Sequence, residues 1–96
     1  MPVYLVTPLS TTTDALNAAV EQAISNQADR YRLPADRGWL IRYSGTSVEL
    51  SNQVGITGQA PGEPPAIGSA MVLPVTAYYG RGPTDMWEWI KTRFES

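Results

Sequence analysis

The acidic side chains are the first candidates for chemistry, because the chain contains neither cysteine nor histidine. It therefore has no thiolate metal site, no disulfide and no imidazole to act as a general base near neutral pH. The acids are scattered, and most of them fall at positions expected to be helix caps or exposed: Asp14, Asp29, Asp36, Glu49, Glu63, Asp85, Glu88 and Glu95. A hard cation needs several converging oxygen ligands. We expect no metal, no cofactor and no enzymatic activity.

A hydroxyl nucleophile has no obvious base in this chain. Serine and threonine are plentiful, but with no histidine the base would have to be a lysine or a carboxylate. Lys91 is the only lysine, and it falls on the polar face of the last predicted helix. We therefore predict no catalytic residues.

Arginines gather in one stretch and are the candidate nucleic-acid contacts. They are Arg30, Arg32, Arg37 and Arg42. Asp29 and Asp36 stand beside them, a pattern that favours a solvated hairpin. The net charge of −2 and the pI of about 4.9 leave no broad basic footprint for nucleic acid. Nucleic-acid binding is therefore the alternative hypothesis, not the preferred one.

Gly80-Arg81-Gly82 stands just before the last predicted helix. Free amides at a helix N-terminus favour an anion there. The motif is short and lacks the lysine of a phosphate-binding loop. We interpret these glycines, with Pro83, as the turn between a strand and a helix, and a bound anion near Arg81 as the alternative.

Aromatic residues crowd the last third of the chain. On a helix over Thr84–Phe94, an apolar arc holds Met86, Trp87, Ile90 and Phe94, while Trp89 falls outside it beside Arg93. Tryptophan, tyrosine and arginine are the usual anchors of protein interfaces. We predict an interface made by Trp89, Arg93, Arg81, Tyr78 and Tyr79. The alternative is that Trp87 lies in the core and Trp89 covers a sheet edge or a second small cluster.

The first half of the chain contains the elements that must position these residues. Val3–Val6 is predicted to be a strand. Leu16, Ala19, Val20, Ala23 and Ile24 then share one helical stripe, with Asn17 outside it and a capping box at Thr11 and Asp14. Tyr31–Leu33 is a short candidate strand, the PADRG segment is a turn, and Trp39–Tyr43 is predicted to be a central strand.

The second half contains one ambiguous element. Residues 46–54 form either a strand after a tight turn or a short helix with a capping box at Thr46 and Glu49 and a stop at Gly55; we choose the helix. Thr57–Gly68 is predicted to be a loop. Ser69–Tyr79 is predicted to be a strand, and Pro74 places it at a sheet edge because proline cannot donate to a ladder.

The order of elements predicts one α+β domain over residues 1–96. A β-α-β-β-α-β order followed by a terminal helix is that of the ferredoxin-like split βαβ fold. In that topology the last strand lies at an edge, where Pro74 is tolerated.

The segments PVYLVTP, WLIRY and AYYGRGPTDMWEWIKTRF resemble small uncharacterised bacterial and phage proteins. Their layout is similar to that of the CRISPR-associated endoribonuclease-like ferredoxin folds. That family carries an aspartate at the end of the first strand, for a metal shared across a dimer. Here the matching stretch is Thr7-Pro8-Leu9, so the resemblance implies the fold and argues against the nuclease activity.

Together these patterns predict a non-enzymatic protein-interaction module that forms a homodimer or binds another protein, as a phage or mobile-element regulator of a host system would. The alternatives are a nucleic-acid-binding or vestigial nuclease domain, and a small-ligand binder with residues 57–68 as a lid.

The N-terminal segment lacks the charge and the apolar length of a signal peptide. No run approaches the roughly 20 apolar residues of a membrane span. We therefore expect a cytoplasmic location and no membrane partner.

Overall fold

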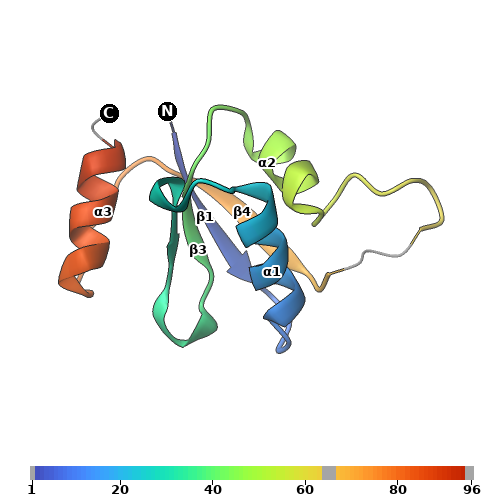
Figure 1. The fold of residues 1–96 in the computed structure, drawn as a ribbon, viewed down its shortest axis with the longest axis horizontal. Helices are drawn as coiled ribbons and strands as arrows, with labels where there is room; N and C mark the ends of the chain where they lie inside the picture. Colours follow the sequence, from blue (N-terminus) through green and yellow to red (C-terminus); the bar gives the residue numbers. More distant parts are fainter. Residues whose placement is uncertain (1, 64–66, 95–96) are drawn as a thin grey trace.

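The computed structural model describes residues 2–63 and 67–94, which form a small α+β domain with a four-stranded antiparallel sheet (Figure 1). In chain order the elements are β1 (Val3–Pro8), α1 (Asp14–Ala23), β2 (Arg30–Arg32), β3 (Trp39–Arg42), α2 (Ser47–Val54), β4 (Ala70–Val75) and α3 (Thr84–Phe94). The strand order is β2-β3-β1-β4, and every neighbouring pair is antiparallel. The predicted α+β class is confirmed, as are the central place of β3 and the edge place of β4.

The sheet is covered on both faces, which gives the domain two clusters of buried side chains. Tyr4 and Val6 of β1 belong to the cluster under α1 and α2, and Val3 of the same strand belongs to the cluster under α3. This alternation follows from the two-residue period of a strand. Figure 1 shows α3 on the opposite side of the sheet from α1 and α2.

The start of α1 differs from the prediction. Its N-cap is Thr13, and the Thr13 side chain makes no capping hydrogen bond. The predicted capping box at Thr11 and Asp14 is wrong, because a box needs its acid at the third helical position and that position holds Leu16. Asn17 is also not on the polar face. It is buried, and its Oδ1 accepts a hydrogen bond from the buried indole nitrogen of Trp39 at 2.9 Å.

The ambiguous segment is the helix α2. The Glu49 N–H donates to Thr46 Oγ1 at 3.1 Å, and the Thr46 N–H donates to Glu49 Oε1 at 3.0 Å, so both halves of the capping box are present. Gly55 follows in the left-handed region with φ of 98°. The Ile56 N–H bonds back to the Ser51 carbonyl at 3.0 Å, the long bond of a Schellman ending.

The strand β4 is shorter than predicted. It ends at Val75 instead of Tyr79, because its partner β1 begins at Val3, which pairs with Val75. Tyr78 and Tyr79 therefore lie beyond the sheet, in the connection to α3. The described part of the predicted loop 57–68 contains no helix or strand, and residues 64–66 lie outside the described residues.

The turn between β2 and β3 differs from a simple hairpin turn. It contains a 3-10 turn over Pro34–Asp36, with Ala35 and Asp36 at φ of 59° and 55°. Gly38 follows at φ of 125°, and a Cβ added there would lie 2.1 Å from the Val6 carbonyl oxygen. This close approach is why only glycine fits at the start of β3.

Gly38→Ala is therefore expected to lower the free energy of unfolding by roughly 2–5 kcal/mol, from the positive φ and the steric overlap together. Urea unfolding followed by circular dichroism measures it. Gly55→Ala is the matched control, since it also has positive φ but would meet nothing within 4 Å, so only about 1–2 kcal/mol is expected. Equal losses in the two variants would contradict the steric account.

Candidate functional site

The free edge of β4 is the first candidate site. Within the part of the chain that the structure describes, β4 pairs with β1 and with no other strand. The Leu9 N–H donates to the Ser69 carbonyl at 2.8 Å, so the opposed pair Leu9–Ser69 is hydrogen-bonded. Hydrogen-bonded and non-hydrogen-bonded pairs alternate along an antiparallel ladder. Met71, Leu73 and Val75 therefore direct their backbone polar groups toward β1.

The residues between them direct their backbone groups outward. Ala70 and Val72 each present an N–H and a carbonyl at the free edge. Pro74 presents only a carbonyl, and its position opposite Tyr4 is one at which the β1–β4 ladder needs no N–H. This explains in hydrogen-bond terms why proline is tolerated in β4. It also leaves two outward donors available to an added strand.

Most of the exposed large apolar side chains lie in β4 or beside it. Among the described residues, the exposed large apolar side chains are Leu9, Val48, Met71, Leu73, Tyr78 and Tyr79. Met71 and Leu73 lie within β4, and Leu9 is bonded to the residue just before it. Val48 of α2 is 67% exposed and shares a groove with Met71. Single exposed apolar residues are ordinary, but a run along an unpaired edge is typical of a binding surface.

The groove between α2 and β4 has a volume of about 450 Å³. Its lining residues are Ser47, Val48, Ser51, Asn52, Thr57, Ala70, Met71 and Val72. None of them is charged. The groove and the β4 edge together form what we call the β4 surface, defined by Val48 and Ala70–Pro74.

Sequence reasoning located the edge strand but missed these exposed side chains. The signal was present in β4, where the residues on both faces of the strand are apolar. That pattern predicts a strand covered on both faces, whereas α3 lies against β1 and leaves Met71 and Leu73 uncovered.

Trp89 is not exposed, contrary to the helical-wheel argument. It is 9% exposed and belongs to the cluster under α3. Its indole N–H donates to the Ala28 carbonyl at 3.1 Å, and its ring lies 6.2 Å from the ring of Tyr31. The alternative placed Trp87 in the core and Trp89 over a sheet edge or a second small cluster. Trp89 does belong to a second small cluster, but Trp87 is only half-buried and packs against that cluster. The helical-wheel argument placed Trp89 outside the apolar arc of Met86, Trp87, Ile90 and Phe94. In the structure, α3 packs on the sheet through a face that is wider than this arc and includes Trp89.

The other predicted interface residues are divided between two places. The Arg93 Nε donates to the Ala28 carbonyl at 2.7 Å, and its guanidinium lies 5.4 Å from the centre of the Trp89 ring. Tyr78 instead contacts Trp87 and Phe94, at ring distances of 6.0 Å and 5.2 Å. Arg81 and Tyr79 are exposed. Trp89 and Arg93 thus hold α3 in place, and their interface role remains a prediction.

Tyr31 links β2 to the start of α3. Burial raises the pKa of its hydroxyl above the usual 10.0, and the hydrogen bond and negative charge of Asp85 raise it further. The neutral phenol is therefore the form that suits this contact.

Three of the four clustered arginines are bonded within the domain. Arg30 donates to the Ile24 carbonyl at 2.6 Å. Arg32 pairs with the Asp36 carboxylate, and Arg42 pairs with Asp29 at 3.2 Å. Arg37 is exposed. The stretch therefore offers nucleic acid fewer available guanidinium groups than its sequence suggests.

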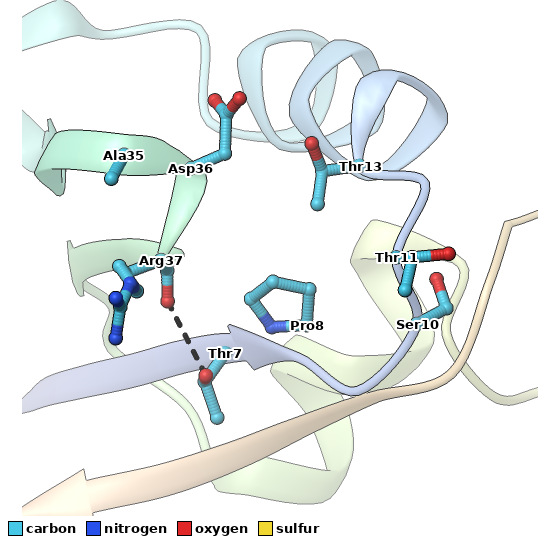
Figure 2. Close-up of a pocket in the computed structure, with 8 residues that line it drawn as sticks. All are labelled: Thr7, Pro8, Ser10, Thr11, Thr13, Ala35, Asp36 and Arg37. Atoms are coloured by element: carbon cyan, nitrogen blue, oxygen red, sulfur yellow. Dashed lines mark hydrogen bonds between the residues drawn. The ribbon is translucent and has the colours of Figure 1, made fainter.

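A polar depression of about 500 Å³ lies where the end of β1, the start of α1 and the β2–β3 turn meet (Figure 2). Its lining residues are Thr7, Pro8, Ser10, Thr11, Thr13, Ala35, Asp36 and Arg37, and none of them is buried. The Thr7 hydroxyl donates to the Arg37 carbonyl at 3.3 Å, and the Arg37 guanidinium points away from Ser10 and Thr11. The depression has a charged rim and no desolvated polar group. It is therefore a weaker candidate for a binding site than the β4 surface.

The other candidate residues that the structure describes lie at the starts of helices or in an exposed connection. Asp14 and Asp85 occupy the first turns of α1 and α3. Gly80, Arg81 and Gly82 are exposed in the connection to α3. Glu95 lies outside the described residues. Within residues 2–63 and 67–94, no three acidic side chains come together as metal ligands, and no helix is long and apolar enough to span a membrane.

Comparison of the chain with protein-family models, with curated proteins and with solved structures gives no match. The resemblance to the endoribonuclease-like proteins stays a prediction. The β4 surface is the feature of the molecule that bears on function.

Proposed function

We propose that this chain is a small, non-enzymatic protein-interaction module that binds an extended segment of protein along the free edge of β4. The observation that carries the proposal is the unpaired edge, with outward N–H groups at Ala70 and Val72 and exposed apolar side chains at Met71 and Leu73. Addition of a strand to such an edge is a common mode of peptide recognition, in which backbone bonds give affinity and alternate side chains give specificity.

The groove beside the edge supports the same mode of binding. A strand added to β4 places every second side chain on the α2 face of the sheet. There the uncharged groove with exposed Val48 offers apolar surface. A partner segment that alternates apolar residues would therefore bury Val48 on one face and Met71 and Leu73 on the other.

The arrangement of elements supports a ferredoxin-like split βαβ domain as the scaffold. The chain order β-α-β-β-α-β, with α3 added after it, supports this assignment, and so does the place of β4 at the edge of the sheet. In such a scaffold the last strand lies at the edge, and here that strand carries the β4 surface.

Selection of peptides from a random displayed library against the purified protein tests the proposal. We expect extended, alternating apolar peptides, because these match the edge. Val72→Pro should abolish their binding by removing an outward N–H while leaving the β1–β4 ladder intact. Val72→Ala is the matched control, since it shortens the same side chain and keeps the N–H, and it should bind within about tenfold of the wild type.

Circular dichroism and urea unfolding check that both variants are folded. Peptides that bind Val72→Pro as tightly as the wild type would place the binding site elsewhere. With the protein kept dilute enough to be monomeric, the failure of selection to give any binder would contradict the proposal as well.

A further inference from the structure

The free edge of β4 is complementary to itself. Ala70 and Val72 each offer a donor and an acceptor, and Pro74 offers only an acceptor. In an antiparallel pair about a two-fold axis at Val72, the residue opposite Ala70 is Pro74 of the partner subunit. Each Ala70 N–H then meets a Pro74 carbonyl, while the Ala70 carbonyl receives no bond from the proline. All four outward donors of the two copies therefore find an acceptor.

We propose that the β4 surface binds a second copy of this chain, with the two β4 strands antiparallel about a two-fold axis at Val72. The proposal rests on the proposed function and names its partner. Val72 and the partner's Val72 exchange a pair of backbone hydrogen bonds, and each Ala70 N–H donates to Pro74 of the partner subunit. The sheets of the two copies become one continuous sheet.

The side chains agree with this register. On the α3 face, Met71 lies opposite Leu73 of the partner subunit. These residues are 43% and 36% exposed in the single chain, and directly opposed apolar side chains stabilise a strand pair. A register centred one residue earlier would pair Met71 with Met71 of the partner subunit and place Leu73 opposite Ser69 of the partner subunit, so one apolar pair would form on this face instead of two.

The absence of charge along the edge favours a second copy over a charged partner. At a two-fold axis a charged side chain meets its own copy, and like charges placed opposite each other are destabilising. Neither β4, with the sequence AMVLPV, nor the lining of its groove contains a charged residue. Edge strands that must stay unpaired are commonly protected by charges or by proline. The described β4 edge has no charge, and Pro74 removes one outward donor while Ala70 and Val72 keep theirs.

Sedimentation equilibrium over a range of concentrations up to about 1 mM tests the association. The wild type is expected to form a dimer that dissociates on dilution. Val72→Pro removes both central donors and should raise the dissociation constant at least thirtyfold, on the order of 1 kcal/mol for each lost bond. Val72→Ala, which keeps the donor, should stay within about tenfold of the wild type. A wild type that is monomeric at every concentration, or a dimer that Val72→Pro does not weaken, would overturn the proposal.

Cysteine cross-linking tests the register and does not depend on a proline variant. The chain has no cysteine, so a single introduced thiol can only pair between copies. Val72→Cys places two thiols on directly opposed residues, with Cα atoms about 5.5 Å apart and within disulfide reach. Leu73→Cys is the matched control, because its copies are diagonal neighbours about 7–8 Å apart. Under mild oxidation Val72→Cys should become a covalent dimer at least tenfold faster, whereas equal rates would overturn the register.

The outcomes separate the two proposals. A chain that stays monomeric but binds selected peptides at the β4 edge would remove the second copy as the partner and leave the proposed function in place. A chain that neither dimerises nor binds peptides there would remove both.

Discussion

Trp89→Ala is expected to lower the free energy of unfolding by about 3–5 kcal/mol, the usual cost of removing a buried tryptophan. The variant loses the contact with Tyr31, the bond to the Ala28 carbonyl and the surface on which Arg93 lies. Since small domains are stable by about 5–15 kcal/mol, this is a large fraction of the total. Urea unfolding followed by circular dichroism measures the loss.

Trp87→Ala is the matched control on the same helix. Trp87 is only half-buried, and its N–H bonds to the Gly82 carbonyl just before the helix. A clearly smaller loss is expected there. If Trp89→Ala were as stable as the wild type and changed only self-association, Trp89 would be the interface residue that the sequence suggested and the account of α3 would be wrong.

Trp39→Ala is expected to cost a similar 3–5 kcal/mol. Trp39 is 4% exposed in the cluster under α1 and α2, and its indole N–H donates to Asn17. Trp39→Phe keeps most of the ring but leaves the Asn17 side chain without this partner, and about 1–3 kcal/mol of loss is expected from that alone. The same unfolding measurement separates the two contributions. A Trp39→Phe variant as stable as the wild type would show that the buried hydrogen bond adds nothing to stability.

Local sequence signals predicted much of the fold. The capping box at Thr46 and Glu49 and the glycine at position 55 were enough to identify α2, because these signals act within one helix. Pro74 indicated an edge strand for an equally local reason, its missing N–H. The bounds of α3, Thr84–Phe94, agree with the predicted helix.

The errors came from contacts between distant segments. Trp89 seemed misplaced on its helix because its partners, Ala28 and Tyr31, lie about sixty residues earlier in the chain. Asn17 seemed to belong to a polar face because its partner Trp39 is in another element. The exposure of Met71 and Leu73 depends on where α3 lies on the sheet, which no periodicity in β4 reveals.

Hydrogen exchange at single amides in β4 tests the central claim that its free edge binds protein. The amides of Ala70 and Val72 point outward, and those of Met71 and Leu73 are bonded to β1 in every state. In dilute protein we predict fast exchange at Ala70 and Val72 and slow exchange at Met71 and Leu73. Raising the protein concentration, or adding a selected peptide, should slow exchange at the two outward amides alone. Outward amides that exchange equally fast under all these conditions would contradict the account.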